Sequence, residues 1–469
     1  MSLVQRMPTW RLRVTLLCVA VVACDGTQRL RAAEPAAAVR LTVFDVDATP
    51  PVGATMAYGP VIRQADLALR SRGIVLIGAE QPIVLCAVDW IGIGNAAHDE
   101  FRAALALAAG TTPARVAVHA LHQHDAPHAD FTAERLLREM GVDSHARFAG
   151  DFHRDVIART AAAVAAALPK ARAVTHVGFG RGRVEQVASN RRLLDDQGKL
   201  VAWRASAAKD PKIAAWPEGT VDPDVAALAF FAGDEPLAVL TSYATHPMSY
   251  YRTGVPGPDF PGIARLIRTQ DVPSAVHVHF TGAAGNVAAG KYNDGSHGTR
   301  VTLALRMAAG MRDAYATALA DRRPLTVDAV GWESVPVILP ARTDLDRAAL
   351  TAQVRAKADR GTFSAIDPLA YASRVDDKHA IDITCLRVGK TRMLHLPGEL
   401  FVEYQLAARE MRPDLDVFLA AYGNYGTGYI GTAVAYAQGG YETQVTSSFV
   451  GPDAEALLMA AMRKLLGAP

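Results

Sequence analysis

Cysteine is scarce in this chain, with 4 residues among 469. Cys18 and Cys24 lie near the N-terminus, and Cys86 and Cys385 lie in apolar runs typical of β-strands. A fold held together by disulfide bonds would need a denser set of cysteines. We therefore expect Cys86 and Cys385 to be buried free thiols, with a single bridge between them as the alternative.

Neither sign of charge is in excess. The chain has 49 basic and 47 acidic residues, for a formal net charge of +2. Nucleic-acid-binding proteins normally carry a basic patch or a known motif, so we expect no nucleic-acid partner. Hydrophobic residues make up 50% and charged residues 20%, which is ordinary for a globular protein. Residues 34–469 contain no internal repeat and no low-complexity block.

The apolar run near the N-terminus is too short to span a bilayer. It extends from Val14 to Ala23 and follows three arginines, Arg6, Arg11 and Arg13. This order, basic and then apolar, is typical of a secretory signal peptide. We therefore expect residues 1–33 to be a signal peptide and the protein to be exported.

Two endings of this leader fit the sequence. Val21-Val22-Ala23-Cys24 resembles the lipobox of bacterial lipoproteins, in which the cysteine is lipidated and tethers the protein to a membrane. Cleavage near Arg31-Ala32-Ala33 would instead release a soluble protein. The expected location is therefore periplasmic, extracellular or lipid-anchored through Cys24.

Strand-like and helix-like segments alternate along residues 34–469, which predicts an α/β fold. Several strand pairs resemble hairpins, such as Val225 to Phe231 and Leu237 to Tyr243, so the sheets should be mixed rather than purely parallel. An amphipathic helix is expected over residues 344–359. We predict mixed β-sheets flanked by helices in a single large domain.

The segment from Val116 to His128 begins as an apolar alternating run and ends in a cluster of histidines. Residues two apart on a strand point to the same face, so His122 and His124 should share a face while His119 lies on the other. Ala126-Pro127 should stop the strand. Two such histidines can present their nitrogens to one metal or one substrate. The alternative is a polar strand end that faces water.

Two further strands end abruptly at polar residues, one at His246 and one at Glu399. Strand ends at the rim of a sheet are where α/β proteins build their sites. Two histidines and one glutamate are a common ligand set for a catalytic zinc ion. More than a hundred residues separate His122, His246 and Glu399 from one another, so no local metal motif is present. The alternatives are a capped strand end for His246 and a first-turn helix carboxylate for Glu399.

Five stretches of the chain, taken together and in order, form a pattern. They are Asp47-Ala48-Thr49-Pro50-Pro51, His122-Gln123-His124-Asp125-Ala126-Pro127, Ala244-Thr245-His246-Pro247, Pro397-Gly398-Glu399, and the segment Asn424 to Glu442, which is rich in Gly and Tyr. This pattern resembles the N-terminal catalytic region of the neutral (non-lysosomal) ceramidases and their bacterial relatives. The resemblance extends over residues 40–450.

The resemblance implies a zinc ion, Zn²⁺, held by His122, His246, Glu399 and Tyr429. A divalent cation favours the phenolate form of a tyrosine, so Tyr429 is chemically suited to the fourth position. Several other tyrosines lie nearby in the sequence, and packing in a loop is the alternative interpretation for any one of them.

The resemblance also implies roles for two residues that do not bind the metal. His124 would face the substrate and assist proton transfer or hold the oxyanion, and Arg191 would line the pocket. The implied activity is hydrolysis of an amide in a lipid-like or other N-acyl substrate. A zinc esterase, an amidase acting on N-acyl sugars or cell-wall material, and a metal-bearing binding protein without turnover are the alternatives.

The chain departs from the family at one catalytic position. Ala288 stands where the ceramidases carry a serine to which a catalytic role is assigned, so a mechanism that needs this hydroxyl is not available here. The surrounding turn, Gly282 to Gly290, could donate backbone N–H groups to an anion or be a tight structural turn. His128, His277 and His279 are interpreted as structural or supporting residues rather than metal ligands.

Overall fold

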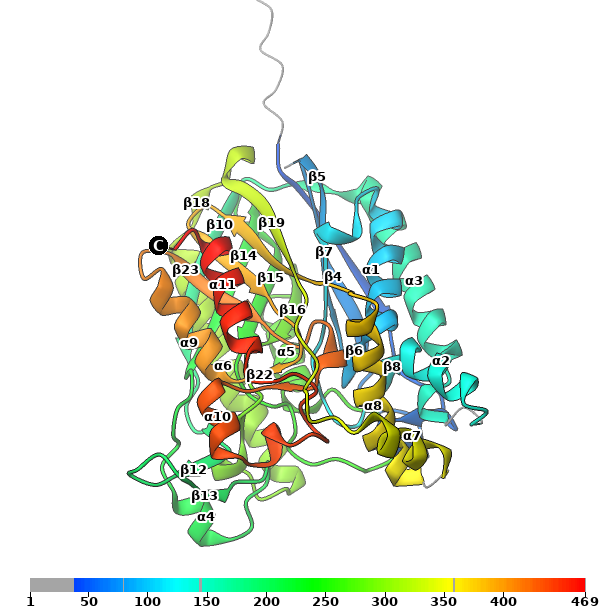
Figure 1. Ribbon diagram of the computed structural model, residues 1–469. Helices are drawn as coiled ribbons and strands as arrows, with labels where there is room; N and C mark the ends of the chain where they lie inside the picture. The colour runs from blue at the N-terminus through cyan, green and yellow to red at the C-terminus, as the bar shows by residue number, and fades with distance from the viewer. Residues whose placement is uncertain (1–37, 79, 143–145, 357–358, 469) are drawn as a thin grey trace, which may run out of the picture. The chain divides into compact units, whose positions relative to one another are not determined.

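The computed structural model describes residues 38–78, 80–142, 146–356 and 359–468. The leader expected at residues 1–33, with its Cys24, lies outside the described residues. The segment Ala37–Pro469 forms one compact unit, which contains three large β-sheets, helices that cover them, and shorter strands in the connecting loops (Figure 1).

The first sheet has the strand order β7-β5-β4-β1-β9. Its strands are β1 (Arg40–Asp47), β4 (Arg70–Gly78), β5 (Glu80–Val88), β7 (Val116–Ala120) and β9 (Arg172–Ala173). The central strands are rich in Val, Ile and Leu, which suit a pleated surface that is buried on both faces. Helices α1 (Asn95–Ala109) and α3 (Asp151–Ala167) pack on its outer face.

The second sheet has the order β16-β15-β14-β10-β18. Its strands are β10 (His176–Arg183), β14 (Asp224–Ala232), β15 (Glu235–Tyr243), β16 (Val276–Thr281) and β18 (Arg323–Pro324). Helices α5 (Asp259–Asp271) and α6 (His297–Ala320) cover one of its faces.

The third sheet has the order β19-β20-β21-β23. Its strands are β19 (Val330–Val337), β20 (Ile381–Val388), β21 (Thr391–His395) and β23 (Asp416–Ala420). Helices α9 (Val402–Met411) and α11 (Ala454–Leu466) pack on it.

The remaining elements are short strands and helices, most of them in loops between the large sheets. The strands are β2 (Thr55–Met56), β3 (Gly59–Pro60), β6 (Gly92–Gly94), β8 (His128–Asp130), β11 (Ser189–Asn190), β12 (Arg192–Leu194), β13 (Leu200–Trp203), β17 (Val287–Ala288), β22 (Glu399–Leu400) and β24 (Tyr429–Ile430). The helices are α2 (Phe131–Glu139), α4 (Pro211–Ala215), α7 (Arg347–Arg355), α8 (Asp359–Asp376) and α10 (Ala433–Gln438).

The three large sheets share one hydrophobic core. Leu85 from the first sheet, Leu228 from the second and Phe418 from the third belong to the same buried cluster. The opposite faces of the sheets form separate clusters with their covering helices. The predicted fold class, mixed sheets flanked by helices in one large domain, is therefore confirmed. Cys86 and Cys385 are buried free thiols, as expected.

The helix expected over residues 344–359 is shorter than predicted, because α7 covers only Arg347–Arg355. A second helix that the sequence analysis did not predict, α8, follows it and contains Pro368 in its interior. Across the described parts of the chain, no helix is long and apolar enough to cross a membrane.

Each large sheet contains one parallel pair of neighbouring strands. The pairs are β5–β7, β15–β16 and β21–β23. Parallel strands run in the same direction, so their carboxyl ends lie at the same edge of the sheet. The loops that follow these ends come together, and backbone hydrogen bonds link them: Ala120 N donates to Tyr422 O, and Ala421 N donates to Thr281 O, each at 2.9 Å.

The strand predicted to carry the histidine pair ends earlier than expected. Strand β7 stops at Ala120, and His122 has a positive φ of 71°, which a β-strand does not allow. His122 and His124 therefore lie in a loop, and the prediction that alternation places them on one strand face is wrong. A non-glycine residue in this strained conformation is often found at functional sites.

Helix α6 lies unusually close to β10. Gly178, Gly180 and Gly182 face the helix on alternate positions of the strand, and a methyl group on Gly180 would lie 2.2 Å from the backbone oxygen of Ala314. The corresponding methyl groups on Gly178 and Gly182 would meet helix carbonyl oxygens at 1.8 and 2.1 Å. Because real contacts of this kind do not occur, the three glycines allow the helix backbone to rest directly on the sheet.

We predict that Gly180→Ala lowers the free energy of unfolding by about 3 kcal/mol, because the helix must move away from the sheet and lose packing. Gly298→Ala, at the start of α6, is the control, because the nearest atom to its added methyl is 4.0 Å away. It should leave stability unchanged or raise it slightly, since alanine favours the helix. Urea denaturation of both variants measures the difference, and equal stability of the two would contradict the predicted role of close packing.

Candidate metal centre

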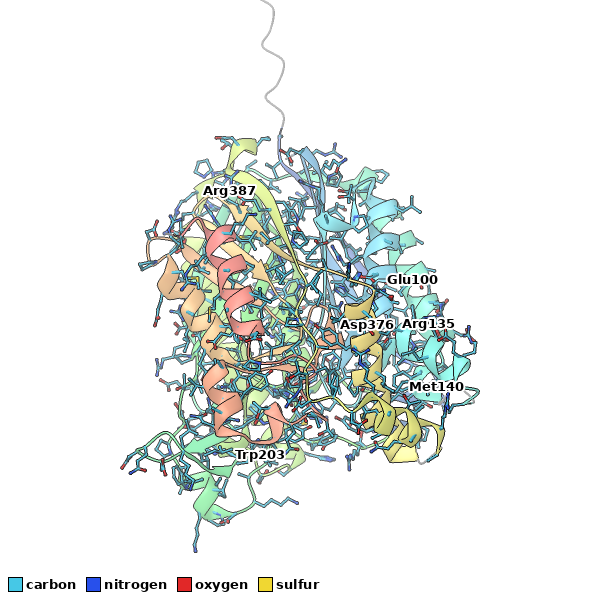
Figure 2. All side chains as sticks on the ribbon, viewed as in Figure 1. Glu100, Arg135, Met140, Trp203, Asp376 and Arg387 are labelled. Atoms are coloured by element: carbon cyan, nitrogen blue, oxygen red, sulfur yellow. The ribbon has the colours of Figure 1, made fainter. Side chains whose placement is uncertain are left out.

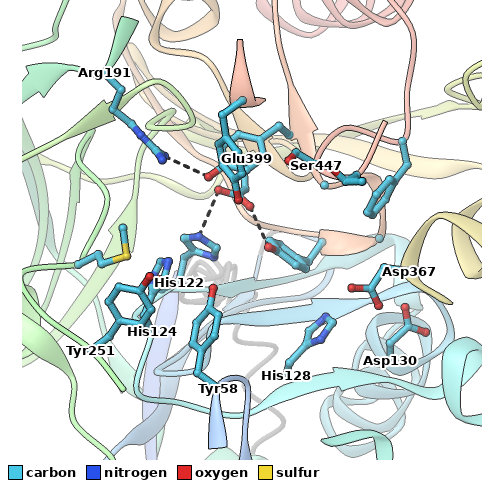
Figure 3. Close-up of a pocket in the computed structure, with 18 of the residues that line it drawn as sticks. Tyr58, His122, His124, His128, Asp130, Arg191, Tyr251, Asp367, Glu399 and Ser447 are labelled. Carbon is cyan, nitrogen blue, oxygen red and sulfur yellow. Dashed lines mark hydrogen bonds and ion pairs between the residues drawn. The ribbon is translucent and has the colours of Figure 1, made fainter. Parts of the chain in front are cut away.

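Three residues from three different sheets meet at the point where the loops converge. His122 follows β7, His246 follows β15, and Glu399 follows β21 in the short strand β22. All three side chains are buried. The sequence analysis predicted that these strand ends would come together, and the structure brings them together; Figure 3 shows His122 beside Glu399.

One carboxylate oxygen of Glu399 lies between the two histidine rings. Glu399 Oε2 is 3.2 Å from His122 Nε2 and 3.0 Å from His246 Nε2. This buried oxygen has no hydrogen-bond partner among the described residues. Its partner oxygen, Oε1, accepts a hydrogen bond of 2.8 Å from the hydroxyl of Tyr425. The carboxylate is therefore oriented by Tyr425, with Oε2 directed at the two imidazoles.

The second nitrogen of each ring defines its tautomer. His122 Nδ1 lies 2.7 Å from the backbone oxygen of Ile91, and His246 Nδ1 lies 2.6 Å from that of Ala284. A carbonyl oxygen only accepts hydrogen bonds, so both Nδ1 atoms must donate. In the neutral ring, each Nε2 then presents a lone pair toward Glu399.

The charge state of His246 places one acceptor against another. Burial lowers the pKa of His246 to about 4, despite the neighbouring Glu399, so this ring is neutral at pH 7. Burial raises the pKa of Glu399, and positive charge on the two imidazoles would lower it well below the ordinary value of 4.5; with neutral rings, a cation between them would supply that charge. A neutral Nε2 and an ionised carboxylate oxygen repel each other at 3.0 Å unless a cation lies beside them. The donor set therefore fits a bound metal ion.

A tyrosine completes this group because of the pairing of two short strands. Strand β22 pairs in parallel with β24, with Glu399 opposite Tyr429. The hydroxyl of Tyr429 lies 3.5 Å from His246 Nε2. Burial raises the pKa of Tyr429 well above 10, and the nearby Arg191 opposes this shift. Tyr429 is thus the tyrosine of its loop whose oxygen faces the same Nε2 as Glu399, whereas Tyr425 binds the outer oxygen of the carboxylate.

His124 lies beside the pair. Its Nδ1 is 3.0 Å from the backbone oxygen of His122 and must donate to it, so Nε2 is an acceptor. The ring stacks on Tyr58, with centroids 5.7 Å apart, and meets Tyr251 edge-on at 5.3 Å. Burial lowers the pKa of His124 well below 6.5. Ligand atoms of His122, His124 and His246 all lie within 4.8 Å of one another, so this buried histidine cluster could hold a metal ion.

Arg191 also lies at this site. Its Nη1 donates a hydrogen bond of 3.0 Å to the hydroxyl of Tyr429. The guanidinium stacks 4.7 Å above the ring of Trp203, which lies on β13 (Figure 2), and is 3.7 Å from the carboxylate of Glu442. Stacking and ion pairing hold the guanidinium in place against the hydroxyl of Tyr429.

A cavity of about 400 Å³ opens onto these residues. Its wall includes His122, His124, Arg191, Glu399 and Tyr429, together with six further aromatic residues. The aromatic side chains are Tyr58, Trp203, Tyr251, Tyr425, Tyr441 and Phe449. His128, Asp130 and Asp367 lie together in another part of the cavity wall (Figure 3). The size of the cavity is that of a typical small-molecule site.

The turn around Ala288 is structural. Gly285 N donates to Leu400 O at 2.7 Å, and Ala283 N donates to Gln405 Oε1 at 3.0 Å, so these N–H groups are already used within the protein. Ala288 is fully buried in β17 and does not line the cavity. Of the two alternatives for this turn, the tight structural turn is the one that the hydrogen bonds support.

Sequence reasoning missed several residues of the cavity. Tyr58 lies between strands of two residues each, which are too short to show a period. Tyr425 was grouped with its neighbouring tyrosines without a separate role. Asp367 lies on α8, whose helical pattern was not recognised. His128 was interpreted as structural, but its ring lines the cavity, whereas His277 and His279 lie on β16 away from it.

Comparison with known proteins supports the fold. No protein-family model matches the chain, and no curated protein matches its sequence. Solved structures do match. The neutral ceramidase from Pseudomonas aeruginosa aligns with a TM-score of 0.65 at 17% identity, over 93% of this chain and 76% of the ceramidase chain. A ceramidase complexed with C2 aligns with a TM-score of 0.63 at 18% identity, over 92% of this chain and 74% of the other. The resemblance inferred from the motifs is therefore confirmed at the level of architecture: this chain has the neutral ceramidase fold.

Proposed function

We propose that this protein is a zinc-dependent hydrolase that cleaves the amide bond of an N-acyl substrate. The observation that carries the proposal is the arrangement of His122, His246 and Glu399. Two Nε2 lone pairs face a carboxylate oxygen that has no hydrogen bond from the described residues, at the wall of a cavity that fits a small molecule.

The donor set matches zinc in chemistry. His122 and His246 would each supply Nε2, Glu399 would supply Oε2, and Tyr429 would supply its phenolic oxygen. Nitrogen and oxygen donors of this kind are typical of catalytic zinc sites, which leave a position open for water or substrate. When bound, zinc would polarise the scissile carbonyl and lower the pKa of a water molecule.

The surrounding residues orient these donors. The backbone oxygens of Ile91 and Ala284 hold the rings of His122 and His246 through Nδ1, a common arrangement behind histidine ligands. Arg191 donates to the oxygen of Tyr429 and favours its phenolate form by its positive charge. Each donor is therefore fixed before substrate arrives, which limits reorganisation during reaction.

His124 is placed to accept a proton. Its Nδ1–H is held by the backbone oxygen of His122, so the lone pair of Nε2 is available in the cavity. The adjacent rings of Tyr58 and Tyr251 hold the imidazole in place and shield it from bulk water. His124 Nε2 would take a proton from the water that attacks the carbonyl and return it to the leaving amine.

Solved structures that resemble this chain include a neutral ceramidase and a ceramidase complexed with C2. This likeness supports a lipid-like N-acyl substrate, with sphingolipids as the first class to test. Assays with different substrates distinguish this activity from that of a zinc esterase and from that of an amidase acting on N-acyl sugars or cell-wall material. The domain extending over residues 34–469 and export with a lipid tether on Cys24 belong to the same proposal.

We predict that the purified protein contains one zinc ion per chain, and that His122→Ala and His246→Ala each lose it. His124→Ala should keep the metal, because His124 is assigned to proton transfer rather than binding. His176→Ala, remote from the cavity, is the matched control and should keep the metal as well. Elemental analysis after dialysis measures zinc content. A wild-type protein without zinc, or equal zinc in His122→Ala and wild type, would overturn the proposed site.

We predict that the zinc-loaded protein hydrolyses at least one N-acyl amide from a panel of ceramide, N-acylethanolamine and N-acetylglucosamine, each assayed beside an ester counterpart. His124→Ala should lower kcat by about 10²- to 10⁴-fold, the usual loss on removal of a general base, while His176→Ala should keep full activity. Faster cleavage of esters would favour the esterase, and zinc binding without hydrolysis of any member would favour a binding protein.

A further inference from the structure

Residues 251–257, the strap, lie between β15 and α5 beside the cavity. The first of them, Tyr251, lines the cavity and meets the ring of His124 edge-on at 5.3 Å (Figure 3). Tyr58 stacks on the same imidazole, and its ring lies 5.0 Å from that of Tyr251. Two aromatic rings therefore flank His124, and the place of one of them depends on the position of the strap.

The strap is fastened by the carboxylate of Asp125, the residue that follows His124. Oδ1 accepts hydrogen bonds from Arg252 N at 2.8 Å and from Thr253 N at 3.3 Å, and Oδ2 accepts one of 2.7 Å from Thr253 Oγ1. Asp125 is only 6% exposed, and hydrogen bonds to a buried carboxylate are among the stronger ones in proteins. Among the described residues, this carboxylate accepts every hydrogen bond that joins residues 251–253 to the rest of the protein.

The backbone of the strap is strained where Asp125 holds it. Arg252 has a φ of 64°, in the left-handed region that residues with a side chain rarely adopt. In this conformation the N–H groups of Arg252 and Thr253 converge on one anion. A strained conformation persists where its surroundings enforce it. The strap should therefore leave this conformation when the carboxylate is removed.

The two flanks of this short segment are anchored independently of the carboxylate. On one side, the guanidinium of Arg300 lies 3.3 Å above the ring of Tyr250 and donates a hydrogen bond of 2.7 Å to its backbone oxygen. On the other side, Ile62 N donates to Gly254 O at 2.8 Å. Loss of the carboxylate should therefore free residues 251–253 and leave the rest of the loop attached.

Contacts between side chains are too weak to hold the strap by themselves. The guanidinium of Arg252 lies 5.2 Å from the ring of Tyr58 and 5.2 Å from that of Tyr251. Both rings are partly exposed, and an exposed cation–π contact contributes little. The hydrogen bonds to Asp125 are thus the larger contribution to the position of Tyr251.

We propose that Asp125 is a positioning residue, which fastens the strap so that Tyr251 holds His124 in place at the cavity wall. The role of His124 in proton transfer rests on the proposed function, whereas the fastening of the strap does not. A general base is effective only when its ring is held at the right distance and angle to the reacting groups.

Cleavage by trypsin after Arg252 measures whether the strap is held. A protease cuts a folded protein where a segment opens locally. We expect Asp125→Ala to be cut after Arg252 at least about tenfold faster than the wild type, because the loss of hydrogen bonds to a buried carboxylate favours the open form by that factor or more. Mass spectrometry of the first fragments identifies the bond that is cut.

Asp195→Ala is the matched control for this experiment. Asp195 Oδ1 also accepts two backbone hydrogen bonds, from Gln197 N at 3.0 Å and from Lys199 N at 2.9 Å, in the loop between β12 and β13. Asp195 does not line the cavity. Its replacement should leave the rate of cleavage after Arg252 unchanged.

Two further variants separate the fastening from a general loss of folding. Asp125→Asn keeps an acceptor oxygen for the N–H groups of the strap, so it should restore much of the protection that Asp125→Ala loses. Thr253→Val removes one of the donors and leaves the carboxylate in place. It should raise the rate of cleavage in the same direction, and it serves as the test where Asp125→Ala does not fold.

Kinetics tests whether the strap acts on His124 through Tyr251. With a substrate that the wild type hydrolyses, Asp125→Ala and Tyr251→Ala should each lower kcat by about 10- to 100-fold, the usual effect of a misplaced catalytic group, with zinc content unchanged. The double variant should lose little more than either single variant, because both changes remove the same ring from His124. Losses that multiply would show that Asp125 acts on activity by another route.

The outcomes are distinguishable. Equal cleavage after Arg252 in wild type, Asp125→Ala and Thr253→Val would overturn the fastening of the strap. Faster cleavage with an unchanged kcat would overturn the positioning of His124. A wild type that hydrolyses no substrate of the panel would reject the hydrolase and the positioning of a base with it, and the cleavage rates would still decide whether Asp125 fastens the strap.

Discussion

The structure depends on one electrostatic constraint, the carboxylate of Glu399 directed at the lone pairs of two buried histidines. In a low-dielectric interior such an arrangement is repulsive, and it persists only where the surrounding fold enforces it or a cation relieves it. Here the fold enforces it from three directions. Each large sheet ends a parallel pair of strands at this point, and backbone hydrogen bonds join the loops that follow, including that from Ala120 to Tyr422. The three sheets are thereby fixed relative to one another by the same contacts that position His122, His246 and Glu399.

Much of this arrangement could be predicted from the sequence. Runs of alternating or continuous apolar residues mark the strands, and polar residues directly after them mark the rim, which is why His122, His246 and Glu399 could be grouped although they lie far apart in the chain. The conformation of the loop that carries His122 could not be predicted from the alternation of apolar residues along the strand. His122 adopts a positive φ, so the alternation that pointed to a shared strand face does not extend to it. The choice of Tyr429 over its neighbours depends on the pairing of β22 with β24, a long-range contact that no local pattern encodes.

The remainder of the cavity was hidden for other physical reasons. Helix α8 contains Pro368, which argues against a helix in any local analysis. Its apolar residues nevertheless recur with a helical period, and Ile366 and Leu369 are buried against α2. Tertiary packing therefore overrides the proline, and it delivers Asp367 to the cavity. The partners of a carboxyl group come from distant segments, so the difference between Asp130, which caps α2, and Asp367, which lies 3.7 Å from Arg147, becomes visible only in three dimensions.

The cavity wall has two parts, one around His122 and Glu399 and one around His128 and Asp367. Under the proposed function, the histidines and Glu399 would act on the bond to be cleaved and would be indifferent to the rest of the substrate. Selection would then depend on the rest of the wall, where aromatic rings supply contact area. Tyr425 links the two parts, because its hydroxyl orients Glu399 while its ring packs between His122 and His128.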